Sequence, residues 1–156
     1  KDKTITARIF SRRDAVICGI EVVKEIFKIL DKHSRVKMYH KDGDNVKAGR
    51  LIIKVNAKAS AILSGERVAL NFLSHLSGIS TKTNNFVKKI KNCKAKILDT
   101  RKTIPGLREL EKYAVKCGGG FNHRFGLWDR VLIKDNHKNL FGSKASIVDL
   151  IKIAKS

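Results

Sequence analysis

The sequence predicts a mixed α/β fold, in which a small α/β sandwich precedes strand and helix units of a parallel sheet. Two observations lead to this prediction. The first part of the chain contains short strand-like runs, glycine-containing turns and one amphipathic helical stretch. From residue 95 onward the order becomes strand, helix, strand, helix, which is typical of parallel strands joined by helical crossovers. At 156 residues the chain can form one ordinary domain, or one small domain and part of a second.

The sandwich is expected to combine strands with one helix. Residues 4–10, TITARIF, alternate apolar and polar side chains, as a half-buried strand does. Between Gly19 and Leu30 apolar residues recur at spacings of three and four, which predicts one apolar helical face. The runs RVKMYH at 35–40 and RLIIKVN at 50–56 are strand-like, and a glycine-containing turn separates them.

The later elements are expected to alternate after a helical layer. Residues 60–76 and 79–90 predict two helices that are broken at the segment SGIS. The segment KAKILDT then predicts a strand, and the next helix is expected to have Pro105 in its first turn. After a loop, DRVLIKD predicts a second strand and SIVDLIKIAK a second helix.

The composition is strongly basic, with 34 Lys and Arg residues against 14 Asp and Glu residues and a formal net charge of +20. Such a charge attracts polyanions, so nucleic acid, an anionic membrane surface and phosphorylated small molecules are candidate partners. The densest basic run, residues 88–96, is interrupted by apolar residues and has no aromatic side chain for base stacking. We therefore interpret it as a solvated, lysine-rich face.

The cysteines and the apolar segments bear on the compartment. Cys18, Cys93 and Cys117 are widely spaced and form no Cys-x-x-Cys pair, which indicates neither a disulfide framework nor a zinc knuckle. The N-terminus has no apolar signal core, and no uncharged apolar stretch approaches the ~20 residues that a membrane-spanning helix needs. We expect a soluble protein in the reducing cytoplasm.

Cationic side chains fall where the predicted later strands end. Arg101 and Lys102 follow KILD, Lys134 ends VLI, and the loop between the two strands adds His123 and Arg124. Because the carboxyl ends of parallel strands meet at one face, these groups are expected to converge and would repel one another without an anion. Any single charge could point to solvent. Together they favour a site for a small molecule with several negative charges.

Longer motifs carry a resemblance to a known family. The segments GERVALNFLSHLSGIST, LDTRKTIPGLRELEKYAVKCGGGFNHRFGL and VLIKDNH resemble, in order, the signature blocks of the quinolinate phosphoribosyltransferase family. The resemblance runs from about Asp14 to His137. It implies an N-terminal α/β sandwich over residues 1–90 and the first strand-helix units of an α/β barrel over residues 91–156. We expect the barrel to be incomplete in this chain, with the later strands absent.

The resemblance also implies an activity. The family transfers a phosphoribosyl group from phosphoribosyl pyrophosphate, with Mg²⁺ on this donor, to quinolinate, and releases pyrophosphate and carbon dioxide with nicotinate mononucleotide. It implies that Arg101, His123, Arg124 and Lys134 hold the two carboxylates and that Lys102 meets a donor phosphate. Lys102 and Lys134 are the expected catalytic groups. The expected substrate-binding set is as follows: Arg67, Arg101, Lys102, Thr103, His123, Arg124 and Lys134.

The expected partners follow from the same resemblance. They are quinolinate, phosphoribosyl pyrophosphate and a second copy of the chain, in a homodimer or a higher oligomer whose active sites include Arg67 of the neighbouring subunit. No membrane or nucleic acid is expected, and no metal ligand in these residues, since Asp135, His137 and His123 make a weak zinc set. Two alternatives stay open: a related phosphoribosyltransferase-fold enzyme with another substrate, and a basic nucleic-acid-binding domain.

Overall fold

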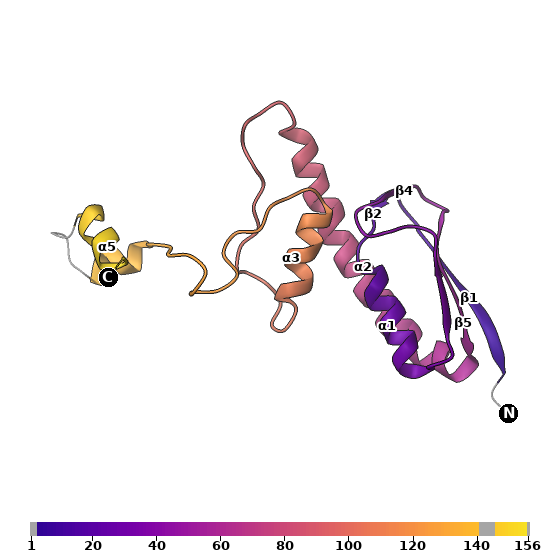
Figure 1. Ribbon diagram of the computed structural model, residues 1–156. Helices are drawn as coiled ribbons and strands as arrows, with labels where there is room; N and C mark the ends of the chain where they lie inside the picture. The colour runs from indigo at the N-terminus through magenta and orange to yellow at the C-terminus, as the bar shows by residue number, and fades with distance from the viewer. Residues whose placement is uncertain (1–2, 141–145, 156) are drawn as a thin grey trace. The chain divides into compact units, whose positions relative to one another are not determined.

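The computed structural model in Figure 1 describes residues 3–140 and 146–155. The chain divides into two compact units, Lys1–His123 and Arg124–Ser156. The first unit contains the strands and the longer helices, and the second contains two short helices. The mixed α/β fold predicted from the sequence is confirmed, whereas the incomplete barrel predicted for residues 91–156 is not.

The sheet of the first unit is antiparallel, with the strand order β1-β5-β3. Strand β5 (Leu51–Lys58) lies between β1 (Thr4–Phe10) and β3 (Arg35–Met38). Alternate residues of β5 are buried, so one face of the sheet is apolar. A second, two-stranded pair joins β2 (Ala15–Val16) to β4 (Asn45–Val46). The strands expected at 4–10, 35–40 and 50–56 are therefore confirmed.

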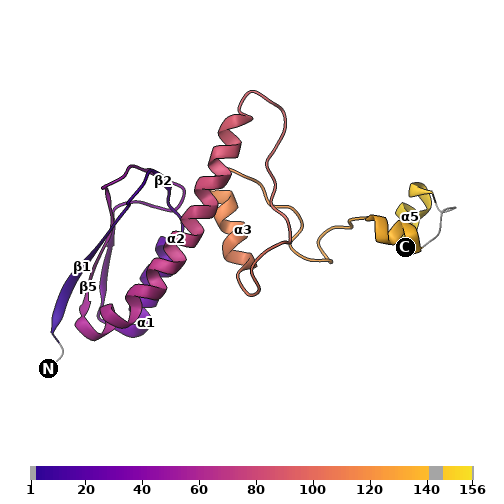
Figure 2. The same cartoon turned by 180° about the vertical axis from the view of Figure 1, so that it is seen from behind.

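Two helices cover the apolar face of the sheet. Helix α1 (Ile20–Leu30) confirms the predicted amphipathic helix, and α2 (Ala59–Lys89) lies beside it in both views of the molecule (Figures 1 and 2). The apolar side chains of α1, α2 and β5 form one buried cluster. Each fully buried aliphatic or aromatic side chain of such a cluster stabilises the fold by roughly 1.5–3 kcal/mol. Gly65 permits the close approach, because a Cβ there would lie 2.7 Å from Leu30 Cδ1.

Helix α2 is continuous, so the break predicted at SGIS is wrong. The serines of this segment contact neighbouring elements instead of ending the helix. Ser77 Oγ accepts a hydrogen bond from Cys18 N (3.0 Å), and Ser80 Oγ donates to Ala114 O (2.8 Å). Both serines are buried. Small polar residues that locally favour a turn thus form packing contacts with partners far away in the sequence.

Helix α3 (Arg108–Cys117) packs against α2 and begins later than predicted. Pro105 and Gly106 form a turn ahead of the helix, and Gly106 has a φ of +78°. A left-handed residue cannot continue a right-handed helix, so the expected start at Pro105 is wrong.

Both strands predicted for the later part of the chain are also wrong. Within the described residues the segment 94–100 makes one parallel bridge, between Leu98 and Phe121, and residues 130–134 have no regular structure. A strand needs a neighbour for its backbone hydrogen bonds, and only a single bridge satisfies that need here. Helix α4 (Asp135–Leu140) begins where DRVLIKD was expected to end as a strand, whereas α5 (Ile147–Ile153) confirms the last predicted helix.

Among residues 3–140 and 146–155, no helix is both long enough and apolar enough to cross a membrane.

The thiols of Cys18 and Cys93 differ sharply in environment, which leads to a labelling prediction. Cys18 is fully buried, and burial together with the nearby Cys117 and Asp42 raises the pKa of its thiol; Cys93 is exposed. Because the thiolate is the nucleophile, we expect iodoacetamide to label Cys93 rapidly in the native protein and Cys18 only after denaturation. Mass spectrometry of the alkylated peptides measures this. Equal labelling rates for both residues would show that the Cys18 region opens in solution.

Candidate functional site

A short parallel pairing sets the frame of the candidate site. Asp99 N donates to Phe121 O (3.1 Å), and Phe121 N donates to Ile97 O (2.8 Å). The two segments run in the same direction, so the residues that follow them lie at the same end of the pairing. We call these two following stretches the exits: Thr100–Thr103 after the first segment, and Asn122 and His123 after the second.

A buried ion pair joins the two exits. Lys112 Nζ lies 2.6 Å from Asp99 Oδ1, and the two side chains are 2% and 8% exposed. Asp99 Oδ1 also accepts a hydrogen bond from His123 N (2.8 Å), while Lys112 Nζ donates to His123 O (3.0 Å). With its amide nitrogen toward Asp99, Asn122 donates to Asp99 Oδ2 and to Lys112 O, at 2.9 Å each.

The turn Thr100–Thr103, which contains Arg101 and Lys102, is held by side chains around it. Lys102 N donates to Thr100 Oγ1 (3.1 Å), and Thr103 Oγ1 accepts from Arg108 Nε (3.2 Å). Just beyond the turn, Ile104 N donates to Glu111 Oε2, whose other oxygen lies 2.9 Å from His75 Nε2 of α2. Helices α2 and α3 therefore anchor the turn at its far side.

Arg101 has an unsatisfied donor at this turn. Its Nε is buried and makes no hydrogen bond with any residue in the described part of the chain. Buried donors are almost always paired, and a guanidinium is a charged donor, so an anionic acceptor suits this position. Lys102 beside it is exposed and available to a ligand in solution.

Arg67 lies elsewhere on the same unit. It is an exposed residue of α2 and makes no ion pair with Glu66 in the part of the chain that the structure describes. His75, which contacts the anchor Glu111, follows Arg67 by two turns of helix, or about 12 Å along the axis. Among the described residues, no hydrogen bond joins Arg67 to the turn Thr100–Thr103 of its own chain.

The remaining predicted site residues belong to the second unit. Arg124 is buried, and its Nη1 donates to Arg130 O (2.9 Å). Lys134 is exposed, and its backbone N donates to His137 Nδ1 (2.9 Å) just before α4. The expectation that Lys134 ends a strand is wrong, because residues 130–134 have no regular structure. The approach of Arg124 and Lys134 to Arg101 stays a prediction.

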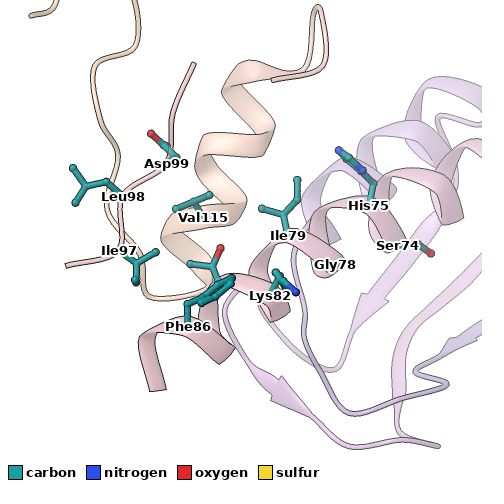
Figure 3. A pocket seen from close by; sticks show the side chains of 11 residues that line it. Ser74, His75, Gly78, Ile79, Lys82, Phe86, Ile97, Leu98, Asp99 and Val115 are labelled. Atoms are coloured by element: carbon teal, nitrogen blue, oxygen red, sulfur yellow. The ribbon is translucent and has the colours of Figure 1, made fainter. Parts of the chain in front are cut away.

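A pocket of about 620 Å³ lies between α2 and the segment Ile97–Asp99 (Figure 3). Its walls are mostly apolar, with Ile79, Phe86 and Val115 among the side chains that point into it, and Lys82 as its cation. Such a lining does not suit a ligand with several negative charges. None of the predicted site residues lines it, although Asp99 and His75, which support the site, do.

Asp99 and Lys112 are the residues that sequence reasoning missed. Lys112 sits in the charged stretch RELEKY, which is typical of a solvated helix, so nothing local marks it as buried. Asp99 falls near the end of the strand that the segment KAKILDT predicts.

The described residues were expected to contain no metal ligand set, and this stays a prediction. Across residues 3–140 and 146–155 no group of three or more His, Cys, Asp and Glu side chains could hold a metal ion. Asp99, the carboxylate at the site, is already paired with Lys112. The Mg²⁺ expected on the donor substrate stays a prediction.

Comparison with protein families gives matches along nearly the whole chain. The family model described as quinolinate phosphoribosyl transferase, N-terminal domain, matches residues 1–77. The model described as quinolinate phosphoribosyl transferase, C-terminal domain, matches residues 79–155.

Individual relatives agree with the family matches. The nicotinate-nucleotide pyrophosphorylase (carboxylating) of Mycobacterium leprae is 42% identical over 156 residues, covering 97% of this chain and 53% of that protein. Quinolinate phosphoribosyltransferase (decarboxylating) 2b of Nicotiana tabacum is 43% identical over 141 residues, covering 90% and 40%. The solved nicotinate-nucleotide pyrophosphorylase of Francisella tularensis is similar with a TM-score of 0.93 and 42% identity, covering 99% and 54%. The chain spans about half the length of the curated relatives it matches.

Proposed function

We propose the function of this chain from one premise: it belongs to the quinolinate phosphoribosyltransferase family. The proposed reaction transfers the phosphoribosyl group of phosphoribosyl pyrophosphate to quinolinate. The ring nitrogen attacks the anomeric carbon, and the bond from that carbon to pyrophosphate breaks with its electron pair leaving on pyrophosphate. Loss of one carboxylate as carbon dioxide, followed by protonation of the ring carbon, gives nicotinate mononucleotide.

The observation that carries this proposal is the buried Nε of Arg101, which has no hydrogen-bond partner among residues 3–140 and 146–155. A guanidinium presents its donors in a planar fork that matches a carboxylate, so a dicarboxylate such as quinolinate would satisfy it. His123 follows the segment that pairs with Leu98, so it lies at the same end of the parallel pairing as Arg101. Lys102 adds an exposed ammonium group for a donor phosphate. A nucleic acid would offer phosphates as well, but the buried position of Nε favours a small ligand.

The roles follow from the charges. In this proposal Arg101, His123, Arg124 and Lys134 bind the two carboxylates and thereby hold the ring nitrogen against the anomeric carbon, which lowers the barrier by orientation. Lys102, with Thr103 beside it, binds the donor. As pyrophosphate departs its negative charge grows, and fixed cations such as Lys102 stabilise that charge. The cationic cluster also favours the carbanion that forms when carbon dioxide leaves.

The wider organisation is part of the same proposal. Residues 1–90 would form the N-terminal domain, and residues 91–156 would form the first part of an α/β barrel. Two chains would associate as a homodimer in which Arg67 of one chain completes the site of the other. Cys18, Cys93 and Cys117 are free thiols, which favours the reducing cytoplasm as the working compartment.

The activity is tested on the complete natural polypeptide that carries this sequence. Carboxyl-labelled quinolinate, phosphoribosyl pyrophosphate and Mg²⁺ are supplied, and labelled carbon dioxide and nicotinate mononucleotide are measured together. We expect equal amounts of both products and no carbon dioxide when the donor is omitted. The Arg101→Ala variant should lose this turnover.

Two outcomes would redirect the proposal. Turnover with another pyridine or base, and none with quinolinate, would point to a related transferase of the same fold. Absence of turnover combined with tight, salt-sensitive binding of unrelated oligonucleotides would favour the nucleic-acid-binding alternative.

A further inference from the structure

The Lys112–Asp99 ion pair is unusual for its burial. Both side chains are withdrawn from water, and Lys112 is 2% exposed. Removing two charges from water has a large desolvation cost, so a buried pair often adds little stability compared with apolar residues of similar size. What this pair provides instead is a fixed geometry, because each end also binds the backbone of a third segment.

That third segment is the main chain at His123. Its N–H is held by Asp99 Oδ1 (2.8 Å) and its carbonyl by Lys112 Nζ (3.0 Å). Fixing the peptide groups on both sides of one residue fixes the direction in which its side chain leaves the backbone. Asp99 also directly precedes the turn Thr100–Thr103, so one carboxylate sets the start of that turn and the position of His123.

Asn122 strengthens the same arrangement. Its side-chain amide donates to the second carboxylate oxygen, Asp99 Oδ2, and to Lys112 O, at 2.9 Å each. Both oxygens of Asp99 are therefore engaged, and the carboxylate cannot rotate without breaking hydrogen bonds. The ionic pair, the amide and the His123 backbone form one closed network across three chain segments.

We propose that Lys112 and Asp99 are positioning residues, which hold the His123 backbone against the Arg101-bearing turn so that both face one anionic ligand. This inference rests on the proposed function for the identity of the ligand, quinolinate. Neither residue is expected to touch the ligand, because their polar atoms are already used by each other and by the backbone.

The test separates positioning from stability by replacing the pair with apolar residues. Lys112→Met alone leaves the Asp99 carboxylate buried and unpaired, and should be strongly destabilising. The double variant Lys112→Met/Asp99→Leu removes both charges, so its melting temperature should return toward that of the wild type. Lys112→Met loses the contact with the His123 carbonyl, and the double variant loses the contact with the His123 amide as well.

A matched control is available on the sheet side of the molecule. Lys47 Nζ lies 2.6 Å from Asp14 Oδ2, and Asp14 Oδ1 accepts a backbone hydrogen bond from Ala48 N (3.0 Å), as in the buried pair. The side chains of Lys47 and Asp14 are 79% and 60% exposed. The variant Lys47→Met/Asp14→Leu therefore makes the same chemical change at a solvated site, and its turnover should equal that of the wild type.

Two readouts are measured on the complete natural polypeptide: kcat/KM for quinolinate, and the hydrogen-exchange rate of the His123 amide without ligand. In the double variant we expect kcat/KM to fall about 10- to 100-fold, since a displacement of about 1 Å can slow catalysis about 100-fold. The His123 amide should exchange at least about tenfold faster, because its acceptor is lost. Lys112→Gln, which keeps a donor for the His123 carbonyl, should recover part of the kcat/KM that Lys112→Met loses.

The outcomes decide the two proposals separately. If the double variant regains the stability, kcat/KM and His123 exchange rate of the wild type, the pair is structural and the inference is overturned. If the wild-type polypeptide does not turn over quinolinate, the proposed function fails, and the His123 exchange rate alone decides whether the pair positions this segment. If the double variant does not fold, the comparison of Lys112→Gln with Lys112→Met decides, and equal losses in both would overturn the inference.

Discussion

Replacing Arg101 with alanine is expected to weaken quinolinate binding by about 10- to 150-fold, the loss of a charged hydrogen bond worth ~1.5–3 kcal/mol. The reason is that Arg101 Nε is buried and makes no hydrogen bond in the described residues, so an anionic ligand would supply its acceptor. Donor binding should change little in the same variant. Calorimetric titration of the complete natural polypeptide with each ligand in turn measures both effects.

Lys102→Ala is the reciprocal change. Lys102 is exposed and supplies a compact ammonium group, which suits a phosphate oxygen better than a planar carboxylate. We therefore expect the Lys102→Ala variant to bind phosphoribosyl pyrophosphate more weakly and quinolinate nearly as well as the wild type. The same two titrations measure this.

Two control variants make the contrast specific. Arg8→Ala, on the edge strand β1, lowers the net charge by the same amount away from the turn, so it should leave both affinities unchanged. Arg101→Lys keeps the charge but removes the planar fork, so it should restore quinolinate binding only in part. Equal losses for both ligands in Arg101→Ala and Lys102→Ala would mean that the pair acts through its general field, and the separate roles would be wrong.

The sandwich was predictable because its signals are local. Polar and apolar residues alternate from Thr4 to Ile9 in strand β1, and α1 shows apolar residues at helical spacing. Both patterns involve only residues close together in the sequence, and the apolar side chains of both elements pack on one core. The structure therefore confirms the predicted strand and helix nearly to the residue.

The errors arise where long-range contacts decide. Ser77 and Ser80 favour a helix break locally, but Cys18 and Ala114 supply partners for their hydroxyls, so α2 continues. The segment 94–100 has strand composition, yet its backbone pairs only through the bridge between Leu98 and Phe121 within the described residues. Strand formation depends on a neighbour, which a local pattern does not reveal.

The candidate site was predictable only in its cations. Arg101, Lys102 and His123 stand in motifs that carry the family resemblance, and their charges point to an anion. Asp99 and Lys112, which join the two exits, could not be found in this way, because a lysine in a charged helix looks solvated in the sequence. Burial of a charge follows from tertiary packing, so the supporting network appears only in the structure.

Arg67, on helix α2, is expected to act in the site of a second chain and not at the turn of its own chain. As an exposed arginine with no ion pair to Glu66 in the described residues, it is free to act at a surface. In the proposed homodimer a two-fold axis repeats every contact, so an arginine that reaches the partner's site does so at both sites. Arg67→Ala and Arg101→Ala should therefore each abolish most of the turnover, although the two residues belong to different parts of one chain.

Mixing these two inactive variants and allowing subunit exchange should restore activity. In the mixed dimer one site carries both substitutions and the other carries neither, so turnover should return toward half of the wild-type value per mixed dimer. Exchange is verified by native mass spectrometry with one chain isotopically labelled. A mixture of Arg101→Ala with Lys102→Ala is the control, because both changes affect the site of their own chain and each site stays defective. Verified exchange without recovered turnover would show that Arg67 does not act across the interface.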